Sequence, residues 1–255
     1  MVVMAARFQY STSQRFSSPL EERAARQQDM YWRVRAKKTL ERLEREARRM
    51  LLLEAELTQF ATGYYAQVGK YVERLSDLEA QLLTATPQEA SSSTIEDVRA
   101  QCSMKETRQA ELKSRYRMLA KEIHPDRAMM VDGVGDRASQ MQVLNAAYQH
   151  GDLATMLRIE ADMLLATTDD ALPALEERLR AVERAADTYA QGYRELLNSP
   201  LNELMLRALN ARLAGWDWME AVVKRVQRAI EASERALVEA NIAAIGDWRQ
   251  GAGAV

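Results

Sequence analysis

The stretch "LKSRYRMLAKEIHPDRAMM", from Leu112 to Met130, decides how the middle of this chain folds. Its apolar residues recur at steps of four, three and four, the spacing of one buried helix face: Leu112, Tyr116, Leu119 and Ile123. Pro125 disfavours helical geometry at the residue before it, so the sequence predicts that this helix ends at His124. The triplet His-Pro-Asp then begins the turn that follows.

A second stripe on the same helix is basic and consists of Lys113, Arg117 and Lys121, which are four residues apart. After the loop "AMMVDGVGD", the segment "RASQMQVLNAAYQHGDLATMLRIE" restarts a helical pattern. Its inward face carries Met141, Leu144 and Tyr148, and Ala147 allows a close helix approach. We expect two helices joined by a loop that displays His-Pro-Asp beside the basic stripe.

In this context the residues resemble the J-domain family of DnaJ-type co-chaperones. The family's second helix carries a tyrosine, a basic residue and Leu-Ala ahead of His-Pro-Asp. Here these positions read Tyr116, Arg117, Met118, Leu119 and Ala120, and then His124, Pro125 and Asp126. The third family helix has an "INEAY"-like core, which "LNAAY" at residues 144–148 matches. Together these matches are far more specific than the tripeptide alone.

The resemblance implies a partner. J-domains dock on a DnaK-type (heat-shock-70) chaperone and stimulate its ATP hydrolysis. By this likeness Lys113, Arg117 and Lys121 meet an acidic surface of the ATPase, where opposite charges speed encounter. The residues expected at the chaperone contact are His124, Pro125, Asp126 and Tyr116, together with the basic stripe. The expected J-domain core consists of Leu112, Leu119, Ile123, Met141, Leu144, Ala147 and Tyr148.

The likeness is incomplete at two points. Met118 stands where the family often has another basic residue, and the first family helix is weakly represented. We place that first helix around Ile95, Val98 and Cys102. Because the chain has one cysteine and no Gly/Phe-rich segment, we expect neither the zinc module nor the linker of the fullest J-proteins.

Nothing in the sequence supplies a nucleophile, a nucleotide-binding loop or a set of metal ligands. Only one histidine besides His124 is present, His150, and its position before Gly151 is typical of a helix C-terminus. We therefore expect a protein that activates a partner ATPase without being an enzyme, and that needs no cofactor. The client protein is not identified by the sequence.

Long helical arms flank the central segment. Apolar residues recur at steps of three and four from Leu40 to Leu82, interrupted only by Glu54, and a similar stripe runs from Leu172 to Leu196. The sequence predicts an all-α fold: a small J-domain-like helical hairpin flanked by long coiled-coil helices, which form an antiparallel hairpin or bundle. A parallel homodimer through residues 40–82 is the alternative.

Breaks in the pattern divide the chain into six parts. We expect a disordered tail over 1–19, a long coiled-coil helix over 20–84, a linker over 85–93 and the J-domain-like part over 94–160. A coiled-coil helix over 169–198 and a C-terminal helical hairpin or bundle over 200–248 follow.

The amino-acid composition limits the possible compartment and partners of the protein. A single cysteine fits a reducing compartment, and we expect the cytoplasm. No apolar run approaches the roughly 20 residues that span a bilayer. The net charge of −2 argues against nucleic acid as partner, although residues 7–49 are basic and leave anionic surfaces open. The competing hypothesis is a J-like coiled-coil scaffold for assembly, without co-chaperone activity.

Overall fold

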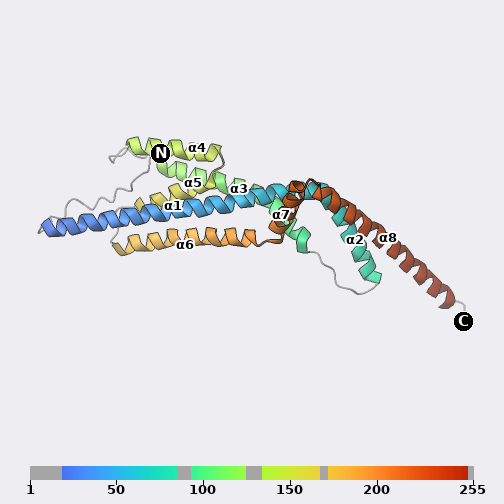
Figure 1. The fold of residues 1–255 in the computed structure, drawn as a ribbon. Helices are drawn as coiled ribbons and strands as arrows, with labels where there is room; N and C mark the ends of the chain where they lie inside the picture. The colour runs from blue at the N-terminus through green and yellow to red at the C-terminus, as the bar shows by residue number, and fades with distance from the viewer. Residues whose placement is uncertain (1–18, 86–92, 125–133, 167–171, 252–255) are drawn as a thin grey trace. The chain divides into compact units, whose positions relative to one another are not determined.

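The computed structural model describes residues 19–85, 93–124, 134–166 and 172–251, and over these ranges the chain is entirely helical, without strands. The first long element consists of α1 (Pro19–Tyr64), a π-helical turn (Tyr65–Gly69) and α2 (Lys70–Ala85). Next come α3 (Ser93–Ile123), α4 (Val134–Gln149), α5 (Leu153–Ala166), α6 (Leu172–Leu197), α7 (Pro200–Leu213) and α8 (Trp218–Gly251) (Figure 1). The predicted all-α class is confirmed.

The helices form two compact units. Unit 1 comprises Met1–Glu54 and Glu106–Leu196, and unit 2 comprises Ala55–Lys105 and Leu197–Val255. Unit 1 therefore contains most of α1, the second part of α3, and all of α4 and α5 with nearly all of α6. It holds the His-Pro-Asp end of α3.

The core of unit 1 follows the apolar stripes that the sequence predicts. Buried residues of α1 pack against α5 and α6 in one cluster: Trp32, Ala36, Leu40, Leu43, Ala161, Leu165, Leu175, Leu179, Val182 and Ala186. Farther along α1, Ala47 packs with Leu153, Ala154 and Leu157 of α5. Steps of three and four keep these side chains on one side of each helix, where they leave water together.

The two predicted arms run in the same direction within unit 1, so they form no antiparallel hairpin there; the helices pack as a bundle, the other arrangement that the sequence allowed. Arg35 of α1 pairs with Glu183 of α6 at 3.2 Å, and farther along both helices Arg42 pairs with Asp187 at 2.5 Å. Figure 1 shows α1 and α6 side by side, starting from the same end. The reason lies between them: α5 runs opposite to α1 and returns the chain to the start of α1 before α6 begins.

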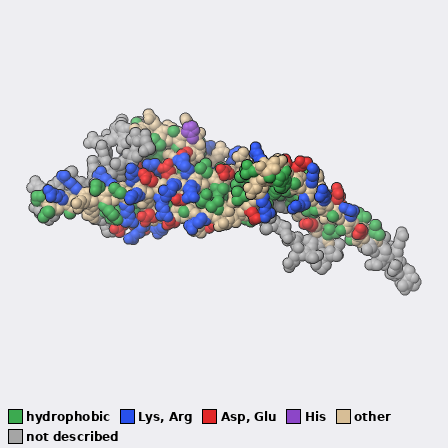
Figure 2. All heavy atoms as spheres, viewed as in Figure 1, with side chains coloured by type: hydrophobic (Ala, Val, Ile, Leu, Met, Phe, Trp, Pro, Cys, Tyr) green, Lys and Arg blue, Asp and Glu red, His purple; other side chains and the backbone are tan. Residues whose placement is uncertain are grey.

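Charged residues cover the outside of α1 and α6, with both signs interspersed (Figure 2). Several arginines of the basic N-terminal part of the chain are paired with acids, among them Arg42 with Asp187 and Arg48 with Glu44. These exposed pairs contribute little stability individually. They do reduce the positive excess that the sequence places on this part of α1.

Unit 2 is built on α2, α7 and α8. Trp218 at the start of α8 lies against Phe60 and Tyr64, with ring centroids 6.4 and 6.2 Å away. Arg74 pairs with Glu234 at 3.2 Å, farther along both segments than the contact of Tyr64 with Trp218, so α2 and α8 also run in the same direction. The Ser199 hydroxyl accepts the Asn202 N–H and caps α7 at its start.

The π-helical turn ties α1 to α2 around Gly69. A Cβ at this glycine would meet the ring of Tyr65 at 2.9 Å, too close for any other residue without a shift. The Tyr65 hydroxyl in turn donates to Glu73 at 2.5 Å. Gly69 is therefore needed for the contact with Tyr65 of its own helix.

The α1–α6 packing predicts a specific loss of stability. Leu179 is fully buried between these helices, so Leu179→Ala removes buried methyl groups and leaves a cavity. We expect a loss of about 2–5 kcal/mol in the free energy of unfolding, measured by equilibrium urea denaturation. The control Leu52→Ala lies on α1, where the side chain is 60% exposed, and should cost less than about 0.5 kcal/mol. Equal losses in the two variants would contradict the packing.

Candidate functional site

The end of α3 is fixed by a small apolar core. Leu119 and Ile123 are each 1% exposed and pack with Leu144 and Ala147 of α4 and with Met156 of α5. Leu112, Tyr116 and Met141 lie partly buried at the edge of this cluster. Six of the seven residues expected to form a core, all but Tyr148, therefore gather on the α3–α4 hairpin.

Tyr148 lies at the rim of the hairpin instead of inside its core. Its side chain is 36% exposed and stacks on Tyr116, with ring centroids 4.3 Å apart. The Tyr116 hydroxyl donates to the Asn145 side chain at 2.9 Å. The "LNAAY" stretch thus contacts the preceding helix through its asparagine and its tyrosine, and Tyr148 was wrongly expected to be core.

The segment expected as a separate first helix is part of α3. Residues around Ile95, Val98 and Cys102 belong to one helix that runs from Ser93 to Ile123 without interruption. No proline or glycine lies between these ends, so nothing in the local sequence stops the helix. The expected separate first helix is therefore wrong.

Lys113, Arg117 and Lys121 all lie exposed on α3, on the face that its apolar core leaves open to water. None of the three makes an ion pair with another residue that the structure describes. Like charges four residues apart destabilise a helix by about 0.2–0.5 kcal/mol per pair. The stripe is therefore a local cost to α3 that an acidic partner would relieve.

His124 is exposed and directly follows the last residue of α3. Its position places the imidazole next to the basic stripe, because Lys121 is in the last turn of the same helix. Pro125 and Asp126 lie outside the described residues. The predicted end of the helix at His124 agrees with the structure.

Beneath the exposed stripe, α3 carries a network of ion pairs that the sequence analysis did not predict. Arg108 donates to both carboxylate oxygens of Glu54 at 2.7 Å and to Glu111 at 2.6 Å. Arg115 contacts Glu111 at 3.1 Å and also pairs with Glu160 of α5. The one sign of this network in the sequence was Glu54, which interrupts the apolar stripe of α1. In the structure its side chain is only 3% exposed.

The network shifts the pKa values of its members. Burial alone raises the pKa of Glu111, but hydrogen bonds from Arg108 and Arg115 outweigh it, so its pKa is below the ordinary value. The pKa of Arg108 is raised, mainly by its hydrogen bond to Glu54. A depressed carboxylate pKa contributes stability above the ordinary value of 4.5, and this contribution is lost as the pH falls through the folded pKa.

A tight turn sets α4 against α5. Gly151 has φ +68°, and the Asp152 N–H reaches back to the Ala147 carbonyl at 2.8 Å, which closes α4. The Asp152 carboxylate then accepts the Thr155 N–H at 3.1 Å and caps α5. Arg48 of α1 pairs with the same carboxylate at 3.1 Å, so the turn is also held to α1.

The described residues offer no group of three or more His, Cys, Asp or Glu side chains that could hold a metal ion. In the same part of the chain, no helix combines the length and the apolarity needed to cross a membrane. The candidate site on α3 is a surface that consists of a fixed helix end, a basic stripe and an exposed histidine.

Searches with the chain against models of protein families, against curated proteins and against solved structures find no match. Its function is therefore inferred from its own residues and their geometry.

The Glu54–Arg108 pair predicts how the network responds to mutation. Arg108→Ala takes the guanidinium away from a carboxylate that is almost fully buried, and we expect a loss of about 2–4 kcal/mol in unfolding free energy. Replacing both residues with leucine should recover most of this loss, because no charge is then left in the core.

The control for this experiment is Arg180→Ala, which removes an exposed pair with Glu176 and should cost less than about 0.5 kcal/mol in urea denaturation. An Arg108→Ala variant no less stable than the control would contradict the role given to the pair.

Proposed function

We propose that the chain is a J-domain co-chaperone, which binds a DnaK-type chaperone through the end of α3 and stimulates its ATP hydrolysis. The all-α fold accommodates this proposal as a J-domain-like hairpin of α3 and α4 between long coiled-coil helices, whose outer parts recognise a client or a location. The protein acts on a partner ATPase and is itself no enzyme.

The observation that carries the proposal is the division of α3 into faces. Leu119 and Ile123 hold one face against α4 and α5, and a 3.6-residue period then turns Arg117 and Lys121 to the outside. The exposed His124 lies where this outward face ends. The arrangement offers an exposed basic ridge, without an ion pair to any residue in the described ranges, that leads to His124.

In the proposed mechanism the basic stripe first attracts an acidic surface on the ATPase. Such charge complementarity raises the rate of encounter and fixes the orientation of the two proteins. His124 and Asp126 then engage the ATPase, where the Asp126 carboxylate is suited to an arginine. Because α3 is already packed against α4 and α5, binding does not have to order this helix first.

One observation favours the alternative of an assembly scaffold without co-chaperone activity. Each unit contains one pair of long helices that run in the same direction, α1 with α6 and α2 with α8. Such pairs give an extended surface suited to assembly. The two functions differ in what they require of His124: the scaffold does not need it.

The deciding experiment is single-turnover ATP hydrolysis by the cognate DnaK-type chaperone, with saturating amounts of this protein. We expect stimulation by the wild type and a loss of at least tenfold of that stimulation in His124→Gln, because this exposed side chain contacts the ATPase. Arg117→Glu should mainly raise the concentration needed for half-maximal stimulation, since it acts through attraction.

The matched control is Arg180→Glu, an exposed charge reversal on α6 that should leave stimulation unchanged. Equal stimulation by the wild type and His124→Gln would contradict co-chaperone activity through this site and favour the scaffold.

A further inference from the structure

Helix α7 in unit 2 has two apolar faces, and only one of them is covered. The inner face includes Leu201 and Ala211, which are 5% and 3% exposed. The outer stripe of the helix has a three–four spacing and is exposed by 47, 50 and 78%: Leu206, Leu209 and Leu213. Scattered exposed leucines are ordinary, but a stripe with the spacing of a helix–helix seam is typical of an interface.

Trp216 follows this stripe in the turn that ends α7, and its side chain is 51% exposed. Gly215 has φ +83°, and the Trp216 N–H bonds back to the Ala211 carbonyl at 3.1 Å. Trp218, two residues later, turns inward to Phe60 and Tyr64.

The flanks of the outer stripe carry excess positive charge. Arg207 and Arg212 stand beside it, against one carboxylate, Glu203, which pairs with Arg207 at 2.5 Å. Arg212 is exposed and makes no ion pair with any other residue in the described ranges. A partner for this stripe would therefore be apolar, with a carboxylate at its edge.

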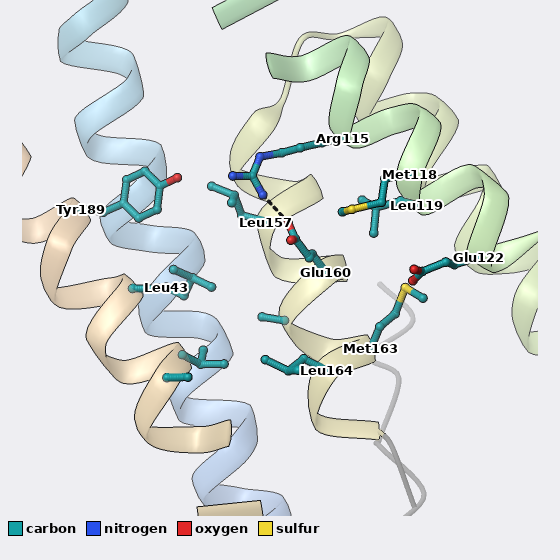
Figure 3. A pocket seen from close by; sticks show the side chains of 14 residues that line it. Leu43, Arg115, Met118, Leu119, Glu122, Leu157, Glu160, Met163, Leu164 and Tyr189 are labelled. Atoms are coloured by element: carbon teal, nitrogen blue, oxygen red, sulfur yellow. Dashed lines mark hydrogen bonds and ion pairs between the residues drawn. The ribbon is translucent and has the colours of Figure 1, made fainter. Parts of the chain in front are cut away.

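Unit 1 contains a groove with these properties (Figure 3). It encloses about 680 Å³ between α1, α3, α5 and α6, a volume within the usual range of binding pockets. Its walls include Leu43, Leu157 and Val182, and the small side chains of Ala181 and Ala185 leave space along α6. The rim is apolar too, because Met118 and Leu164 are 41% and 44% exposed.

The charges of the groove complement those of α7. Two carboxylates, Glu122 and Glu160, line it against one guanidinium, Arg115. Arg115 is already held by Glu160 and Glu111. Glu122 is exposed and forms no ion pair with a residue that the structure describes. The groove thus has one carboxylate in excess, and the stripe on α7 has one guanidinium in excess.

The groove and the outer stripe of α7 also have the same length. On α3 the groove extends from Arg115 to Glu122, which is seven residues, or about 10 Å of helix. The three leucines of the outer stripe span the same length, from Leu206 to Leu213. A helix laid along the groove would therefore place its whole apolar row inside.

We propose that the outer stripe of α7 from a second copy of the chain occupies the groove in unit 1, with Arg212 beside Glu122. Each copy has one stripe and one groove, so two copies that exchange them leave neither surface exposed. This inference goes beyond co-chaperone activity and does not depend on it. It identifies the chain's own α7 as the helix that fills the groove behind α3.

Sedimentation velocity of the full chain over the micromolar range tests the proposal. The wild type should convert from monomer to dimer as its concentration rises. Leu209→Glu places a charge in the apolar row, and Ala185→Trp fills the groove, so each should weaken dimerisation by at least tenfold. The control Val238→Glu changes another exposed apolar residue, 56% exposed on α8, and should dimerise like the wild type.

A charge exchange tests the pairing itself. Glu122→Arg or Arg212→Glu alone should weaken dimerisation severalfold by placing like charges together. Both substitutions in one chain should restore it, because the opposite charges then meet again in reversed order. Helix content by circular dichroism checks that every variant is folded.

Three outcomes would overturn the proposal: a wild type that stays monomeric, a Leu209→Glu or Ala185→Trp variant that dimerises like Val238→Glu, or a charge-exchanged chain as weak as its single variants. No chaperone is present in these measurements. They are therefore independent of the ATPase experiment with His124→Gln. Either the dimer proposal or the co-chaperone proposal can fail without the other.

Discussion

Burial of Leu119 and Ile123 fixes the direction of every other side chain on the second half of α3. Successive residues of an α-helix are turned by about 100°, so one face against α4 and α5 determines the remaining faces. Arg117 and Lys121 are turned to water, and Arg115 is turned to Glu160. One apolar contact thus separates the exposed basic stripe from the buried ion pairs.

Local patterns in the sequence predicted what they directly encode. The steps of three and four identified the buried residues of α1 and α6, and Pro125 marked the end of α3. The direction of α6 was not predictable in this way, because apolar spacing is the same for parallel and antiparallel partners. That direction depends on α5, which returns the chain along α1. Arg108 had no local signal, since its partner Glu54 is 54 residues away.

The groove and the basic stripe occupy different faces of α3, and this has a functional consequence. Met118 departs from the J-domain pattern at a position where a basic residue is common. In the structure it lies on the rim of the groove, apart from the exposed row that contains Arg117. An apolar residue at this position suits a contact with a helix. Met118 therefore changes the groove face of α3. The basic stripe of the proposed chaperone contact is retained.

The central claim is that the outward face of α3 meets the ATPase of a DnaK-type chaperone. Photo-cross-linking tests it most directly, with a benzophenone amino acid at position 117 on α3 or at position 180 on α6. The account predicts a cross-link to the ATP-loaded chaperone from position 117, its loss in His124→Gln, and none from position 180. No cross-link from position 117, or equal cross-linking from both positions, would contradict it.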